Sequence, residues 1–180
     1  MNKSLISLFV LMVSVYFPPV LAADQCVKLV FDNYCLGGSF KQQLEKVPAD
    51  MQPQVKGERE GVIYQKENEK IYVMAYQGVI YKIVHTFLPE TQATLLDLRR
   101  HLQQKYGNYQ ELSNYPEATK NKARQMSYIR RGEGELKNAW QIPGQRWRVE
   151  LGWTRKLGVH VAYLVNELDE LQKEAARRGL

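Results

Sequence analysis

Alternating apolar residues in the middle of the chain place the tightest limit on its fold. Residues 71–76 and 79–87 both carry apolar side chains at alternate positions, which is the period of a β-strand with one buried face. Only Gln77 and Gly78 separate the two runs, and glycine tolerates the positive φ that a two-residue hairpin turn requires. A further β-rich run covers residues 61–66. Together these residues predict an antiparallel meander of three strands.

An amphipathic helix is predicted directly after this meander. Pro89 suits the first turn of a helix, and Gly107 suits its end. The apolar positions between them recur at the spacing of one helical face: Leu95, Leu98, Leu102 and Tyr106. Such a helix needs a sheet on which to bury its apolar side chains.

The second half of the chain repeats this order of elements. Residues 137–142, 146–153 and 158–165 predict a second meander. Asn166 is a suitable N-cap for a final helix. The predicted buried face of that helix consists of Leu168, Leu171 and Ala175.

Residues 108–136, between the first helix and the second meander, are polar and lack a clear apolar period. A segment of this length without secondary structure is unusual inside a compact domain. It indicates either a mobile functional loop or a strand near residues 126–129. The sequence leaves these two alternatives open.

These elements predict an α+β fold of tandem βββα units, in which two antiparallel meanders are each followed by a helix. The pseudo-repeat halves cover about residues 24–107 and 108–180, and together they form a single domain over residues 23–180. A short N-terminal helical and turn segment precedes the first unit, where Ser39 can cap a helix that runs to Val47. At the level of architecture this plan resembles small exported inhibitor and envelope-scaffold domains, although no family motif accompanies it.

The N-terminus has the layout of a cleavable signal peptide. Lys3 precedes an apolar run over residues 5–17, two prolines and a small-residue sequence that ends at Ala22 and Ala23. A transmembrane helix needs about 20 apolar residues, and the prolines come too early for one. Cleavage after Ala22 removes residues 1–22, and the loss of the single charge of Lys3 lowers the net charge from +6 to +5. Because no later stretch is apolar enough to span a bilayer, we expect the cleaved chain not to span a membrane.

Cys26 and Cys35 are the two cysteines of the chain, and an oxidising compartment favours their pairing. In one straight helix their Cα atoms would lie about 13 Å apart, whereas a disulfide allows only about 4.4–6.8 Å. Against the disulfide, four apolar residues fit a helical stripe: Val27, Val30, Phe31 and Tyr34. The two interpretations conflict, and we expect the disulfide, with a strand and a turn near Asp32 and Asn33 instead of an unbroken helix. The CxxC spacing of redox enzymes is absent, which favours a structural role.

The strongest surface signal is an aromatic and basic segment over residues 140–156, preceded by a basic cluster over residues 120–131. Arginines on an exposed strand face beside tryptophans can grip a carbohydrate, a peptide or an acidic partner. The alternative is that the tryptophans fill the core and the arginines form the solvated side of an amphipathic strand. The alternation favours this alternative, because it places Trp147 and Trp153 on one face with aliphatic residues. The candidate binding residues are Arg130, Arg131, Arg146, Arg148, Trp140 and Arg155.

The spacing of reactive residues indicates no metal or cofactor site. His85, His101 and His160 lie in different predicted elements without an adjacent cysteine. Ser39 follows Gly37 and Gly38, but the nucleophile-elbow pattern with glycine on both sides of the serine is missing, and Ser39 is explained as a helix cap. No phosphate-binding loop or dinucleotide fingerprint occurs. We therefore name no catalytic residue, no metal and no cofactor, and a non-enzymatic role is favoured while enzymatic activity stays open.

Taken together, the charge and the export signal predict an exported, non-enzymatic binding or accessory module, inhibitor-like or immunity-like, that acts through a protein surface. The expected location is the periplasm, or alternatively the medium after secretion. The basic charge favours another exported or envelope protein, or an anionic envelope component, as the partner, and export argues against nucleic acid. The alternative function is a cell-envelope hydrolase acting on peptidoglycan or polysaccharide, which would need a deep cleft that joins two titratable groups.

Overall fold

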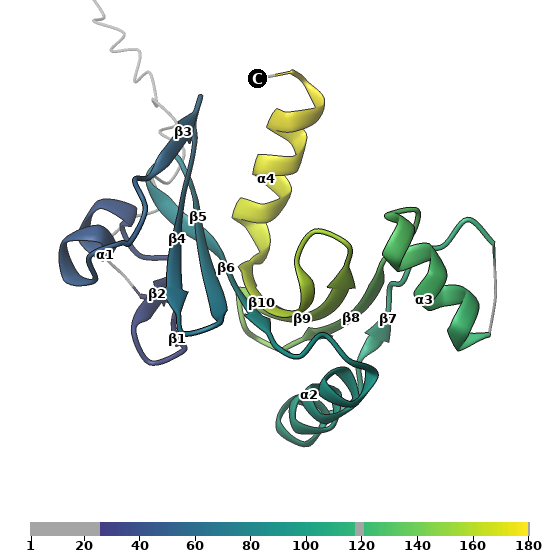
Figure 1. The fold of residues 1–180 in the computed structure, drawn as a ribbon. Coiled ribbons are helices and arrows are strands. Elements are labelled where there is room, and N and C mark those ends of the chain that lie inside the picture. The colour runs from purple at the N-terminus through teal and green to yellow at the C-terminus, as the bar shows by residue number, and fades with distance from the viewer. Residues whose placement is uncertain (1–25, 118–120, 180) are drawn as a thin grey trace, which may run out of the picture.

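A computed structural model describes residues 26–117 and 121–179, and the predicted signal peptide, residues 1–22, lies outside them. The chain is of the α+β class, as predicted, and its described strands fall into a hairpin and one large antiparallel sheet (Figure 1). The hairpin consists of β1 (Lys28–Val30) and β2 (Tyr34–Leu36). The large sheet contains β3 (Gln54–Lys56), β4 (Arg59–Lys66), β5 (Glu69–Tyr76), β6 (Val79–Phe87), β7 (Gln110–Glu111), β8 (Leu136–Gln141), β9 (Trp147–Thr154) and β10 (Gly158–Val165).

The helices of the described residues begin and end at capping residues that the sequence only partly indicates. They are α1 (Phe40–Lys46), α2 (Gln92–Tyr106), α3 (Lys122–Arg131) and α4 (Asn166–Arg177). Ser39 caps α1 as predicted, and its side chain accepts a hydrogen bond from the Gln42 N–H. Asn166 was expected to cap α4, but it is the first helical residue, and Val165 occupies the cap position without a side-chain hydrogen bond. The reason lies in the site described below, where the Asn166 side chain accepts a hydrogen bond from an arginine.

Residues 122–131 form a helix, whereas the sequence predicted either a loop or a strand there. Asn121 caps the helix by accepting a hydrogen bond from the Arg124 N–H, and Gly132 ends it in the left-handed conformation at φ 77°. Only Tyr128 and Ile129 of this helix are buried. With so few apolar positions, the helical period does not stand out from the polar residues around it.

Both predicted meanders are present, and one strand pair joins them into a single sheet. The sheet order is β3-β4-β5-β6-β10-β9-β8-β7, in which β6 pairs with β10 from Val159↔Phe87 to Leu164↔Lys82. The Gln77-Gly78 turn between β5 and β6 has positive φ at both residues, as a two-residue hairpin requires. Although α2 and α4 follow the two meanders, β3, β7 and α3 are additional, and the predicted tandem βββα arrangement is therefore not confirmed in that form.

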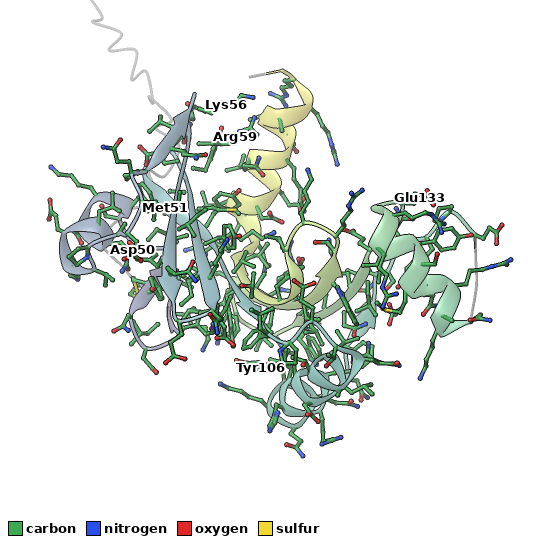
Figure 2. All side chains as sticks on the ribbon, in the orientation of Figure 1. Asp50, Met51, Lys56, Arg59, Tyr106 and Glu133 are labelled. Atoms are coloured by element: carbon green, nitrogen blue, oxygen red, sulfur yellow. A yellow bond between two sulfur atoms is a disulfide. The ribbon has the colours of Figure 1, made fainter. Side chains whose placement is uncertain are left out.

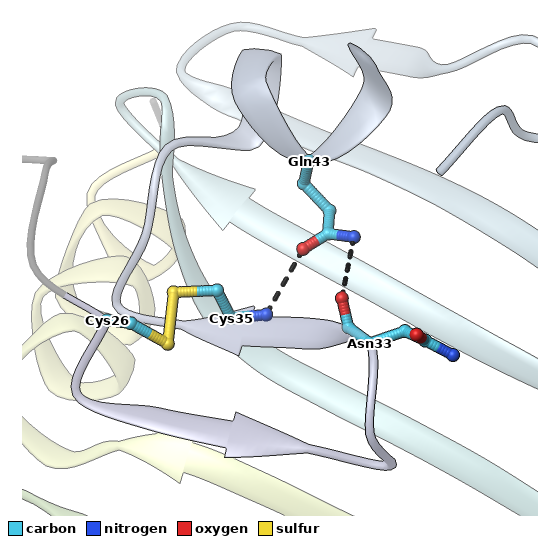
Figure 3. The surroundings of a disulfide bond; sticks show 4 residues. All are labelled: Cys26, Asn33, Cys35 and Gln43. Carbon is cyan, nitrogen blue, oxygen red and sulfur yellow. Dashed lines mark hydrogen bonds between the residues drawn. A yellow bond between two sulfur atoms is a disulfide. The ribbon is translucent and has the colours of Figure 1, made fainter. Parts of the chain in front are cut away.

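The predicted disulfide forms across the N-terminal hairpin (Figure 3). Cys26 and Cys35 have Cα atoms 5.3 Å apart, because the chain reverses between β1 and β2. Phe31 and Asp32 both adopt positive φ at this reversal, which no helix allows. From α1, the buried Gln43 side chain accepts a hydrogen bond from the Cys35 N–H at 3.1 Å and ties the helix to the hairpin.

Direct strand pairing sorts the sheet side chains into two faces. The first face includes the row Val62, Val73, Ile83, Tyr163, Val149 and Trp140, all at most 8% exposed. The hairpin packs on it through Phe31, whose ring centroid lies 5.5 Å from that of Tyr163. Helix α2 packs on it through Tyr106, labelled in Figure 2, whose ring centroid lies 6.0 Å from that of Trp147. The buried Ile129 of α3 belongs to the same core. We call this face the covered face.

The second face, the open face, includes the row Tyr72, Val84, Ala162 and Glu150. In Figure 1, α4 stands on this side of the sheet, opposite α2. The covered and open faces thus differ in which helices they carry. Among the described residues, no helix is long and apolar enough to cross a membrane.

Candidate functional site

The structure divides the five candidate arginines between the two ends of β9. Arg130 and Arg131 lie in the last turn of α3, and Arg155 follows β9 in the turn to β10. Arg155 Nη1 donates a hydrogen bond to the Arg131 carbonyl at 3.2 Å, which brings these residues together. Arg146 and Arg148 lie at the opposite end, where β9 begins. No single surface therefore holds all five guanidinium groups.

Trp140, the sixth candidate, is a core residue. Its side chain is 1% exposed on the covered face, and its Nε1 donates a hydrogen bond to the Gly107 carbonyl at 2.9 Å. Trp147 and Trp153 are also buried on that face. The three tryptophans fill the core, as the alternation of β9 favours, and Trp140 has no surface with which to contact a partner.

A groove forms where the end of α3 meets the β9–β10 turn. Its cavity volume is about 820 Å³, and its lining includes Arg131, Glu133, Arg155 and Lys156. Arg131 Nη2 lies 2.7 Å from Glu133 Oε2, and both side chains are about half exposed (Figure 2 labels Glu133). The lining also includes Glu135, so three cations face two carboxylates and the groove carries a positive excess of one charge, and the exposed Arg130 is next to Arg131 in the sequence. We call this site the basic groove.

The arginine expected on a solvated face of β9 is instead buried in a charge network. Arg148 has 15% of its side chain exposed, and its Nε donates to Glu150 Oε1 at 2.8 Å. Its Nη2 donates a short hydrogen bond to Asp169 of α4. The prediction that Arg148 faces solvent is wrong, because α4 covers this part of the open face and supplies the Asp169 carboxylate. Arg146 is exposed, as expected, and pairs with Glu167 at 3.3 Å.

Asp169 links α4 to the sheet through two cations. Besides its bond to Arg148, it lies 2.7 Å from the Nζ of Lys173, and its side chain is 5% exposed. Burial alone would raise the pKa of Asp169, but the hydrogen bonds from Lys173 and Arg148 outweigh burial and hold that pKa below its ordinary value. The carboxylates of Asp169 and Glu150 are thus both engaged by cations of the network.

Lys82 lies beside this network without joining it. On the open face it is directly opposite Met74 of β5 and Leu164 of β10. Within the described ranges, no hydrogen bond or ion pair connects its half-buried ammonium group to another side chain. Burial lowers the pKa of Lys82, and the nearby Glu150 and Asp169 offset part of that effect. Sequence reasoning missed this residue, although a lone lysine among the apolar residues of β6 was a visible signal.

The open face also carries an apolar patch formed by residues of β5, β6, β10 and the β9–β10 turn. Its buried centre is Val84, Ala162 and Leu164, each at most 1% exposed. Partly buried apolar side chains surround that centre: Tyr72, Met74 and Leu157. We call these six residues, with Lys82 between Met74 and Leu164, the sheet patch.

His160 borders the sheet patch, and its ring lies over Gly152 of β9. A Cβ atom on Gly152 would be 2.5 Å from His160 Nε2, so glycine leaves the space that the imidazole occupies. The Nδ1 atom donates to the Gly158 carbonyl at 2.9 Å, and burial lowers the pKa of His160. The ring is therefore neutral at neutral pH, with Nε2 as an acceptor. In the part of the chain that the structure describes, no group of three or more His, Cys, Asp or Glu side chains is placed to hold a metal ion.

Comparison with known proteins yields little. No family model matches the sequence, and no curated protein matches it. A solved structure with partial likeness is a cysteine-rich secretory protein from Staphylococcus aureus, at 9% sequence identity and a TM-score of 0.41. The likeness covers 73% of this chain and spans 45% of the length of that one. At this level of similarity it carries no argument about function.

Proposed function

We propose that the protein is an exported, non-enzymatic binding module, inhibitor-like or immunity-like, that acts through a protein surface in the periplasm. The disulfide supports export, because such bonds persist in oxidising compartments and are rare in the cytosol. The small number of cysteines favours the periplasm over secretion into the medium. The partner is another exported or envelope protein that presents acidic side chains.

The observation that carries this proposal is that the Lys82 ammonium group has no hydrogen-bond or ion-pair partner within residues 26–117 and 121–179. A cation withdrawn from water without a counter-ion costs free energy. Glu150 and Asp169 are the nearest acidic groups, but Arg148 and Lys173 already bind them. A carboxylate from a partner seated on the sheet patch would supply the missing counter-ion, and desolvation on binding would strengthen the pair.

The surroundings of Lys82 suit a protein contact. Tyr72 and Met74 belong to residue types enriched at the centres of protein interfaces. At the far end of β9, the basic groove presents a further set of cations. An acidic partner that reached both surfaces would also be steered toward them by the net positive charge of the chain.

Affinity capture from a periplasmic extract tests the proposal. The variants are Lys82→Glu and Lys82→Met on the sheet patch, the double variant Arg130→Glu/Arg131→Glu at the basic groove, and Lys41→Glu as an exposed control on α1. We expect wild type and control to retain the same acidic protein, and Lys82→Glu to weaken its binding about tenfold or more. Lys82→Met keeps the side-chain volume, and its melting temperature is expected to equal or exceed that of wild type because it removes a desolvated charge.

The groove variant separates the two surfaces. Charge reversal at Arg130 and Arg131 is expected to weaken binding without lowering the melting temperature, because the Arg131–Glu133 pair is exposed and contributes little to stability. Unchanged affinity in this variant would remove the basic groove from the proposal. Equal retention of the same proteins by wild type, Lys82→Glu and the groove variant would overturn the proposed function.

A further inference from the structure

We infer that the cavity between α2 and α3 binds a small amphipathic anion, with an apolar body and a single carboxylate or sulfonate head group. The cavity lies over the covered face, on the side of the sheet opposite Lys82 and the sheet patch. It is therefore a separate site, and the inference goes beyond the proposed function.

The size and the walls of this cavity suit a small ligand. Its volume is about 430 Å³, within the range of about 300–1,000 Å³ that is usual for small-molecule sites. Helices α2 and α3 form two of its sides and the sheet forms its floor. The apolar side chains that line it are Leu95, Leu96, Met126, Ile129, Leu136 and Trp153. An apolar ligand body would find these contacts already assembled.

The acidic group of the cavity is fully engaged by the protein. Glu111 accepts a hydrogen bond from Asn138 Nδ2 at 2.7 Å through one oxygen and a short one from Ser113 through the other. Asn138 is 0% exposed and accepts a hydrogen bond from Arg99 Nε at 2.8 Å. The arrangement holds the guanidinium of Arg99 at the cavity, with its Cζ 5.5 Å from the centre of the Tyr109 ring, and no carboxylate of the described residues forms an ion pair with it.

Two further donors line the same cavity. Among the described residues, Tyr115 Oη is buried without a hydrogen bond of normal geometry, although the Ser113 hydroxyl lies close enough to lower its pKa slightly against the larger effect of burial. Burial raises the pKa of Tyr115, so its hydroxyl is protonated and can donate a hydrogen bond. Lys122, in the first turn of α3, lines the same cavity and is exposed. Arg99, Tyr115 and Lys122 together offer two positive charges and a hydroxyl to an anionic head group. The one carboxylate among the described lining residues, Glu111, has both oxygens occupied by hydrogen bonds from Asn138 and Ser113.

Calorimetric titration with decanoate, and with decanol as its uncharged counterpart, tests the site on the full chain. Leu96→Trp is designed to fill the cavity from a position that is 40% exposed, so that the fold tolerates it. Leu171→Trp, on a 48% exposed position of α4, is the matched control. Arg99→Met and Tyr115→Phe probe the head-group end, and circular dichroism confirms that each variant is folded.

We expect wild type and Leu171→Trp to bind one decanoate per chain, and Leu96→Trp to lose about tenfold or more in affinity. Arg99→Met should reduce the preference for decanoate over decanol, a ratio that a general loss of stability would not change. Fluorescence of anilinonaphthalene sulfonate, displaced by decanoate, gives an independent readout. Absence of saturable binding at millimolar decanoate, or equal affinities in the two tryptophan variants, would overturn the inference. Because none of these residues belongs to the sheet patch, that failure would leave the proposed function untouched.

Discussion

Asp169 shows how a single carboxylate can join two elements. It lies on α4, its side chain is 5% exposed, and it pairs with Arg148 of β9 and with Lys173 one helical turn further on. A buried ion pair contributes little compared with an apolar pair of similar volume. Removal of one member is costly, however, because the remaining charge stays buried without a counter-ion. Arg148 would keep Glu150 as a counter-ion, but its Nη2 would lose the carboxylate it donates to.

We therefore expect Asp169→Asn to lower the free energy of unfolding at neutral pH by about 1–3 kcal/mol, the cost of a buried donor that loses its partner. Since the pKa of Asp169 is lower in the folded chain than in the unfolded chain, its contribution is complete above the ordinary value of 3.8 and is lost as the pH falls through the folded value. Urea unfolding at pH 7 and at pH 3 measures both effects. The difference between wild type and the variant should shrink at pH 3, and an equal difference at both pH values would contradict this assignment.

The same residue marks a limit of sequence reasoning. The apolar stripe of α4 was predicted to bury Leu168, Leu171 and Ala175, but Leu171 is 48% exposed and Asp169 is buried instead. Hydrophobicity alone cannot show that an acidic side chain will meet an arginine from a distant strand. Lys82 escaped prediction for a related reason, because strand alternation separates two faces without telling which one the helices cover.

At the scale of elements, local periodicity predicted those helices and strands whose pattern is set by residues close together in the sequence. The strands of both meanders and α2 follow from side-chain alternation and helical spacing, and they appear near the expected bounds. The helix α3 was missed because its signal lies in its caps, Asn121 and Gly132, and not in an apolar stripe. The pairing of β6 with β10 joins residues about 80 positions apart, and no local pattern records such a contact.

The hairpin that carries the disulfide gives an element-scale prediction. Cys26 and Cys35 are nine positions apart, and cross-linking a loop of this size stabilises a fold by about 2.5 kcal/mol through the unfolded chain. The double variant Cys26→Ser/Cys35→Ser should lose about that amount in guanidinium unfolding. Dithiothreitol should destabilise wild type to the same extent and leave the variant unchanged. A variant as stable as oxidised wild type would show that the disulfide does not stabilise the fold.

At the scale of the whole molecule, the hypothesis of export makes a prediction about mass. The exported chain should lack residues 1–22 and begin at Ala23, which intact mass spectrometry of a periplasmic fraction measures. Its thiols should resist alkylation, since Cys26 and Cys35 are joined. A chain expressed without residues 1–22 should stay in the cytosol with both thiols free to react. Recovery of the polypeptide from Met1 onward in the cytosol would contradict the proposed location.

The two outer strands of the large sheet are its shortest members, with β3 spanning three residues and β7 spanning two. Edge strands present unpaired N–H and C=O groups on which another chain can extend a sheet into a fibril. The outer strands themselves offer few such groups, and they carry charged side chains, Lys56 on β3 and Glu111 on β7, that oppose the flat stacking of fibril growth. Beyond β3, where the rest of β4 forms the rim, Asp50 accepts a hydrogen bond from the Gln65 N–H at 2.8 Å and so blocks part of the template for self-aggregation.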